Sequence, residues 1–140
     1  MAAIVLVDTS AWVAFFAEKD QYHETALEAF EEVGEEGAEL ATTDFVIAET
    51  VTRVRGRAGV EEAARAWESL ENGEIVELLD VSRECRAAAR RIFRKYRELD
   101  LSFVDCVSFA VMNKLGIREA LTFDSDFAKA GYVVLPRKRK

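Results

Sequence analysis

The chain has 140 residues, of which 50% are hydrophobic and 32% are charged, and this balance suits one globular domain over residues 1–140. No apolar run approaches the roughly 20 residues that cross a bilayer, and the N-terminus lacks the basic flank of a signal peptide, so we expect a cytoplasmic protein with no membrane partner. Two cysteines and one histidine give little support to zinc sites or to Ser/His and Cys/His catalysis, and a net charge of −7 argues against a passive nucleic-acid coat.

The first half of the chain alternates between strand and helix patterns. Residues 4–7 form a run rich in β-branched residues, IVLV, that predicts a buried strand, and Thr9 or Ser10 can cap the helix that follows. Apolar spacing and glycine positions predict the other elements of this half: helices over 22–36, from 43 or 44 to about 56–59 and over 60–70, and strands over 39–41 and 74–79.

The second half continues the alternation, with helix patterns over 82–96, 102–114 and 126–130 and strand patterns over 120–123 and 132–135. Strands that alternate with helices predict an α/β fold, here a three-layer sandwich in which helices flank a mostly parallel central sheet of four to five strands. Such sheets carry their ligand sites outside the carboxyl ends of the strands. The residues that follow each strand are therefore the candidates for a functional site.

Two aspartates follow predicted strands directly. Asp8 ends the run IVLVD, and Asp124 ends the run ALTFD. Each has an ordinary structural explanation, because Asp8 can cap the next helix and Asp124 can form an Asx turn or a cap. Position alone does not decide between a functional site and two local caps.

Two further acids lie in helical patterns among apolar neighbours. Asp105 stands in SFVDCVSFAVM, three residues after Ser102, so a capping box explains the residue type but not the burial that its neighbours imply. Glu49 lies in mid-helix in FVIAET, where a pair with Arg53 at i+4 would contribute only about 0.2–0.5 kcal/mol. Burying an unpaired carboxylate costs more than such a pair returns, so both positions need a further reason.

Together, the four acids indicate a metal site. Carboxylates that are brought close repel one another, and their pKa values rise unless a cation lies among them. Oxygen ligands without histidine or cysteine favour Mg²⁺ or Mn²⁺ over zinc or copper. We therefore expect Asp8, Glu49, Asp105 and Asp124 to converge in space on a divalent ion.

Four motifs in order, DTSAWVAFF, FVIAET, LSFVDCVSFAVM and LTFDSDFAKAGY, resemble the PIN domain, and most of all its small VapC-type toxins. The resemblance covers essentially the whole chain. It implies an endoribonuclease of a type II toxin–antitoxin system, in which Asp8, Glu49, Asp105 and Asp124 bind Mg²⁺ or Mn²⁺. The ion and its ligands would position water for hydrolysis of an RNA phosphodiester bond.

The resemblance also implies supporting residues around the metal. Ser10 and Ser102 match hydroxyl positions that the family keeps close to the ion. Asp126 is a plausible helper at the mouth of the site, and it is also an alternative to Asp124 as the fourth acid, because the two lie only two positions apart.

Basic residues are the candidates for contacts with RNA. Arg53 and Arg57 share one face of the helix that carries Glu49 and are the first candidates for phosphate contacts. A second basic cluster lies between Arg90 and Arg97, and a solvated helix face explains it without any ligand.

Two protein partners follow from the resemblance. One is a cognate antitoxin whose C-terminal part covers the active site, and the other is a second toxin copy that completes an RNA groove in a homodimer. The candidate docking surface for the antitoxin is the apolar run on the first helix, although core packing explains two of its members: Trp12, Val13, Phe15 and Phe16.

Three other functions fit parts of this pattern. A non-catalytic PIN-like module that binds RNA or a protein is disfavoured by the four intact acids. A phospho-accepting receiver would want a second acid after the first strand and a lysine after Phe123, which the chain lacks. A Mg²⁺-dependent phosphatase with an aspartyl nucleophile would want an aspartate where Ser10 stands.

Overall fold

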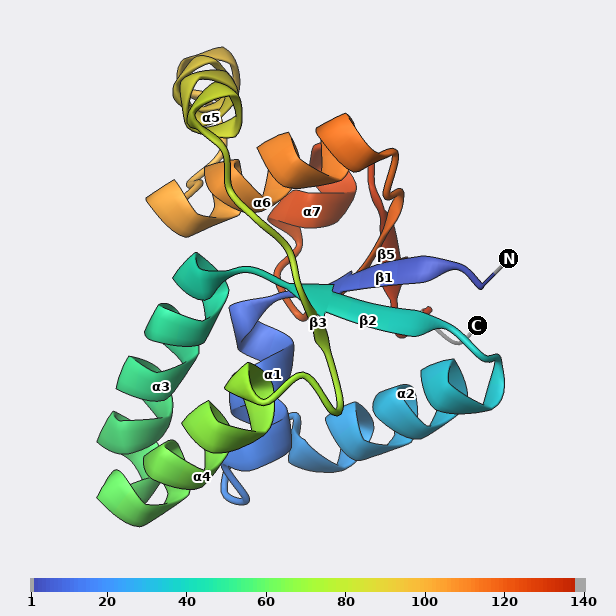
Figure 1. Ribbon diagram of the computed structural model, residues 1–140, viewed down its shortest axis with the longest axis vertical. Coiled ribbons are helices and arrows are strands. Elements are labelled where there is room, and N and C mark those ends of the chain that lie inside the picture. The colour runs from blue at the N-terminus through green and yellow to red at the C-terminus, as the bar shows by residue number, and fades with distance from the viewer. Residues whose placement is uncertain (1, 138–140) are drawn as a thin grey trace.

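The computed structural model describes residues 2–137, and Figure 1 shows how they are arranged. The strands in this range are β1 (Ile4–Val7), β2 (Glu39–Thr42), β3 (Glu77–Leu78), β4 (Glu119–Leu121) and β5 (Val133–Leu135). The helices are α1 (Thr9–Phe16), α2 (His23–Glu35), α3 (Asp44–Ala58), α4 (Val60–Glu71), α5 (Arg83–Lys95), α6 (Phe103–Leu115) and α7 (Asp126–Lys129). Among these helices, none has the length and apolar composition needed to span a membrane.

The strands form one sheet in the order β3-β2-β1-β4-β5, and every pairing in it is parallel. In Figure 1, α1 to α4 lie on one side of this sheet and α5 to α7 lie on the other. The prediction of a three-layer α/β sandwich with a parallel sheet of four to five strands is therefore confirmed. β1 is the central strand, paired with β2 on one side and with β4 on the other.

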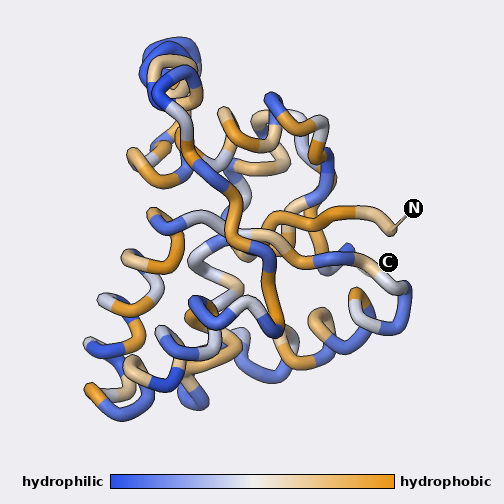
Figure 2. The backbone as a smooth tube through the Cα atoms, viewed as in Figure 1, coloured by the Kyte–Doolittle hydropathy of each residue, from blue (hydrophilic) through white to orange (hydrophobic). Residues whose placement is uncertain are grey.

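β1 supplies apolar side chains to both faces of the sheet, and Figure 2 shows this strand as hydrophobic along its length. Val5 and Val7 pack in a core that includes Trp12 of α1, whereas Leu6 packs in a second core that includes Phe109 of α6. The sides alternate because successive side chains of a strand point to opposite faces. The backbone remains extended at Asp8, so the alternation places Asp8 on the side of Leu6 and α6.

Three strands are shorter than predicted, and the last of them, β5, begins one residue late, at Val133. The pattern over 74–79 yields only β3, because residues 72–76 form bends before the chain joins the edge of the sheet. The pattern over 120–123 ends as β4 at Leu121. Beyond it, the Phe123 N–H donates to Ser10 Oγ at 2.9 Å, which ties the end of β4 to the residues that follow β1.

Leu6→Ala should lower the free energy of unfolding by about 2–5 kcal/mol, because a fully buried leucine leaves a cavity between β1 and α6. The control is Leu115→Ala, at an exposed position near the end of α6, which should change the stability by about 0.5 kcal/mol or less. Urea unfolding followed by circular dichroism measures both values. Equal losses in the two variants would contradict the central place of β1 in the core.

Candidate functional site

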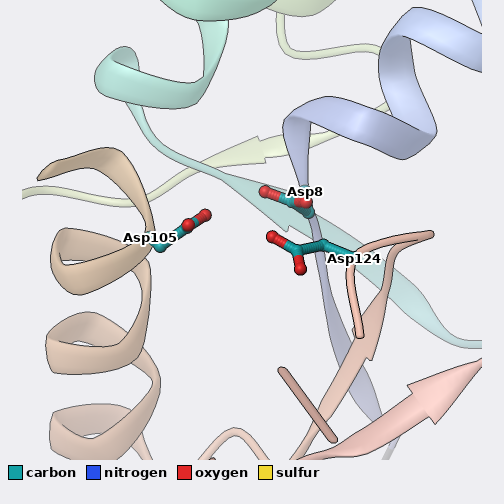
Figure 3. Close-up of side chains that lie close together, drawn as sticks. All are labelled: Asp8, Asp105 and Asp124. Carbon is teal, nitrogen blue, oxygen red and sulfur yellow. The ribbon is translucent and has the colours of Figure 1, made fainter. Parts of the chain in front are cut away.

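Three aspartates converge at the carboxyl edge of the sheet, and Figure 3 shows their side chains pointing toward one another. One carboxylate oxygen from each of Asp8, Asp105 and Asp124 lies within 4.8 Å of the other two. Asp8 follows β1, Asp124 comes shortly after β4, and Asp105 lies in the first turn of α6. The Asp8 N–H donates to the Leu121 carbonyl at 3.0 Å, which joins the end of β1 to the end of β4, its parallel neighbour. The sheet topology thus brings together acids from opposite ends of the sequence.

Two hydroxyl groups orient the Asp8 carboxylate. Thr122 Oγ1 donates to Asp8 Oδ2 at 2.8 Å, and Ser10 Oγ donates to the same oxygen at 3.1 Å. Asp8 occupies the N-cap position of α1, so the prediction that Thr9 or Ser10 caps this helix is wrong. The Asp8 side chain makes no capping hydrogen bond, however. Helix capping therefore does not explain this carboxylate.

The predicted capping box at the start of α6 is present. The Asp105 N–H donates to Ser102 Oγ at 3.1 Å, and the Ser102 N–H donates to Asp105 Oδ2 at 3.1 Å. The box uses only one oxygen of the Asp105 carboxylate. Asp105 thus caps the helix and also takes part in the three-aspartate cluster, and Ser102 fixes its orientation.

The structure distinguishes Asp124 from Asp126. Asp124 Oδ1 accepts a hydrogen bond from the Asp126 N–H at 2.9 Å, and the Asp124 N–H donates to Thr122 Oγ1 at 3.0 Å. The Asp126 carboxylate instead lies 3.8 Å from Lys129 Nζ and is outside the three-aspartate cluster. Asp126 therefore supports the site through its backbone, while Asp124 supplies the carboxylate.

Burial and mutual repulsion raise the pKa values of the clustered acids. Burial raises the pKa of Asp8, and the charge of Asp124 adds to this effect, while hydrogen bonds from Thr122 and Ser10 oppose it. Burial and then the charge of Asp8 raise the pKa of Asp105 from 3.8 to about 7. A cation lying among these carboxylates would favour their ionised forms. The arrangement is therefore suited to holding a divalent ion.

The cluster lies in an open cavity of about 500 Å³ whose walls also contain Glu49, Arg53 and Arg57. Glu49 is outside the three-aspartate cluster, and its carboxylate is 3.8 Å from the Arg53 guanidinium, the predicted i+4 pair. The structure therefore brings carboxylate oxygens of three of the four predicted acids within 4.8 Å of one another and places Glu49 at the cavity wall. Arg53 and Arg57 share the predicted helix face with it.

Two residues of the site were not identified from the sequence. Thr122 binds Asp8 and directly follows β4, so the rule that ligand sites lie after strand ends was a usable signal. Asp20 lies between α1 and α2 and forms an ion pair with Arg57, and the side chain of Asp20 is only 7% exposed. No local pattern indicates that pair, because its members lie on separate elements.

Two of the four residues of the candidate antitoxin surface on α1 belong to the core, as expected from the sequence. Trp12 and Val13 are only 1% and 3% exposed, so they belong to the core and are excluded from any docking surface. Phe15 and Phe16 are half-buried, with their rings 5.0 Å apart in an edge-on arrangement. Only these two phenylalanines remain candidates for contact with a partner.

Residues 5–132 match the family model described as the PIN domain. The 23S rRNA-specific endonuclease VapC20 of Mycobacterium tuberculosis is 34% identical over 130 residues, which cover 93% of this chain and 96% of that protein. The VapC ribonuclease of Aquifex aeolicus is 28% identical over 133 residues, covering 91% of this chain and 92% of that one.

Solved structures give the same picture. The crystal structure of Mycobacterium tuberculosis VapC20, described as a sarcin-ricin loop cleaving toxin, superposes with a TM-score of 0.85 at 33% identity, over 94% of this chain and 97% of that one. VapBC2 from Rickettsia felis, bound to a DNA fragment from its promoter, superposes with a TM-score of 0.66 at 15% identity, over 94% and 96%. The second likeness concerns the fold alone.

Asp105→Asn should stabilise the metal-free protein at pH 8 but not at pH 4. The pKa of Asp105 is higher in the folded than in the unfolded state, so the folded protein binds more protons and loses stability as the pH rises from about 4 to about 7. A shift of one pKa unit corresponds to about 1.36 kcal/mol. Because solvent screens part of the interaction, we expect Asp105→Asn to raise the free energy of unfolding by roughly 2 kcal/mol at pH 8. Urea unfolding in EDTA at both pH values measures it, with Asp80→Asn, an exposed acid outside the cavity, as control. Equal pH dependence in the wild type and Asp105→Asn would contradict the raised pKa of Asp105.

Proposed function

This chain belongs to the PIN domain family, and we propose that it is a metal-dependent endoribonuclease toxin that hydrolyses RNA phosphodiester bonds and is neutralised by a cognate antitoxin. The observation that carries the proposal is the three-aspartate cluster, whose oxygens lie within 4.8 Å of one another in a cavity open to solvent. A 34% identity with a 23S rRNA endonuclease over nearly the full length supports the same activity.

The donor set fits Mg²⁺ or Mn²⁺. Asp8, Asp105 and Asp124 offer carboxylate oxygens only, and no histidine or cysteine lines the cavity among the residues that the structure describes. These three residues would hold the ion. When bound, the ion supplies Lewis-acid stabilisation of the phosphate charge and lowers the pKa of water.

The protein's own contribution is to hold the three carboxylates in place before any ligand arrives. Thr122 and Ser10 fix Asp8, Ser102 fixes Asp105, and the Asp126 N–H fixes Asp124. Partners of this kind orient metal ligands and strengthen the site.

The cavity wall supplies the remaining proposed roles. Glu49 is the fourth acid of the proposal, and its carboxylate, in the wall of the same cavity, is proposed to accept a hydrogen bond from water. Arg53 and Arg57 line the same cavity and are proposed to bind RNA phosphates. Arg57 is the weaker candidate of the two, because Asp20 already neutralises part of its charge.

We propose 23S rRNA as the first substrate to examine, because the relative that shares 34% identity is named for that RNA. This proposed substrate supports the further proposal of a cytoplasmic location. We further propose that residues 1–140 form one domain, that the toxin is a homodimer and that Phe15 and Phe16 contribute to the antitoxin surface. A non-catalytic RNA- or protein-binding module is the second candidate, and the intact three-aspartate cluster disfavours it.

The purified chain, freed of any antitoxin, should cleave 23S rRNA in ribosomes when Mg²⁺ or Mn²⁺ is present, and EDTA should stop the cleavage. Asp8→Asn and Asp105→Asn should each reduce the rate by at least about a hundredfold and abolish the rise in melting temperature on Mn²⁺ addition, because a ligand charge is lost. Asp80→Asn is the matched control and should behave as wild type. Cleavage that persists in EDTA would refute the metal mechanism.

Thr122→Val should lower the cleavage rate by about tenfold to a hundredfold, because it removes the hydroxyl that orients Asp8, and a hydrogen bond to a charged group contributes about 1.5–3 kcal/mol. Thr122→Ser keeps the hydroxyl and should retain most of the activity. Thr122→Val should also weaken Mn²⁺ binding measured by calorimetry, which loss of packing alone would not do. Full activity of Thr122→Val would remove this residue from the site.

A further inference from the structure

A groove between α5 and α6 is separate from the acid cavity and is used by none of the roles above. It encloses about 820 Å³ and is lined by four arginines and two phenylalanines: Arg86, Arg90, Arg94, Arg97, Phe93 and Phe103. Phe93 is 60% exposed and Phe103 is 62% exposed, which is unusual for large apolar side chains. Figure 1 shows α5 lying across α6 at the outer side of the sandwich.

The charge of this groove is positive and unneutralised. Arg86, Arg90 and Arg94 follow a spacing of four residues, so they form one stripe along α5. Within residues 2–137, none of the four groove arginines forms an ion pair with an acid. The chain as a whole carries a net charge of −7, so this stripe is a local concentration of the opposite sign.

The groove adjoins the acid cavity at the start of α6. Ser102 and Asp105 line the cavity, whereas Phe103, which lies between them in the chain, lines the groove. The Phe103 ring lies 5.6 Å from that of Phe45, and the Arg86 guanidinium lies 5.3 Å from the Phe45 ring. Phe45, Phe103 and Arg86 therefore lie beside one another at the start of α6, where Ser102, the chain neighbour of Phe103, lines the cavity.

We propose that the α5–α6 groove binds single-stranded RNA next to the cleaved bond, with the arginines on its phosphates and the phenylalanine rings stacked on its bases. This inference rests on the proposed function, because it extends the substrate contact of the same enzyme. Proteins that bind single strands combine a positive groove with exposed aromatic rings, which accept any base. An acidic peptide would explain the arginines, but the exposed rings and the position of the groove beside the cavity at the start of α6 favour the polymer that is cleaved there.

The test measures the binding of labelled single-stranded oligouridine and oligoadenine of about 16 nucleotides to the full chain, by fluorescence anisotropy in EDTA. The double variant Arg90→Gln/Arg94→Gln is compared with Arg83→Gln/Arg91→Gln, which removes the same charge from exposed positions of α5 outside the groove. The groove variant should bind about tenfold more weakly, and its salt slope should fall by about 1.4, because two phosphate contacts are lost. The control should lose no more than about twofold.

The stacking part of the proposal has its own variants. Phe93→Ala should weaken binding by about tenfold, whereas Phe93→Tyr, which keeps the ring, should bind as wild type. Because this side chain is mostly exposed, both variants should fold, and circular dichroism checks this. Equal affinities of Phe93→Ala and Phe93→Tyr would overturn stacking.

Other occupants of the groove give different results. Equal RNA affinities of the groove and control double variants would overturn the proposal, and loss of binding to a glutamate-rich peptide in the groove variant alone would then assign the groove to a protein. A changed mass of the groove variant in analytical ultracentrifugation would assign the groove to contact between copies of the chain.

Cleavage by the wild type with Mg²⁺ is measured in parallel. If the wild type does not cleave RNA but the groove variant still binds RNA more weakly than the control, only the endoribonuclease proposal is refuted. If the wild type cleaves RNA but the groove and control variants bind it equally, only the groove proposal is refuted.

Discussion

The structure depends on the close approach of three carboxylates that repel one another. Asp8, Asp105 and Asp124 share a region in which burial and neighbouring charges raise the pKa values of the first two. The parallel pairing of β1 with β4 makes this approach unavoidable, because both strands end at the same edge of the sheet and α6 starts beside it. The fold therefore holds three carboxylates where they repel one another, and a cation bound among them would reduce that repulsion.

The hydrogen bonds around the cluster act on orientation more than on charge. Hydroxyls of Thr122 and Ser10 donate to Asp8, and backbone N–H groups of Ser102 and Asp126 donate to Asp105 and Asp124. These neutral donors favour the ionised carboxylates only partly, since the pKa of Asp105 stays near 7 despite its two bonds with Ser102. They instead restrict the side chains to one arrangement, so the entropy of ordering them is lost on folding and not on ion binding.

Local patterns predicted the elements, and the strand-end rule predicted where Asp8 and Asp124 would meet. The sequence could not separate the two functions of Asp105, because a capping box and a metal ligand need the same carboxylate at the same position. The distance of Glu49 from the cluster depends on how α3 packs, and the Arg57–Asp20 pair depends on the loop between α1 and α2. Such contacts between separate elements leave no periodic trace in one chain.

The arginine stripe on α5 and the acid cavity lie on separate surfaces, and this arrangement affects how a protein of net negative charge binds RNA. A net charge of −7 and an acid cavity both repel RNA, and a bound ion offsets this only at short range, because salt screens charges beyond roughly 10 Å. A stripe of arginines on α5, none of them ion-paired within residues 2–137, adds positive charge on a surface separate from the acid cavity. This stripe thereby adds to the attraction for RNA that Arg53 and Arg57 provide in the cavity wall. The acids can then remain close enough to hold a cation without having to attract the substrate themselves.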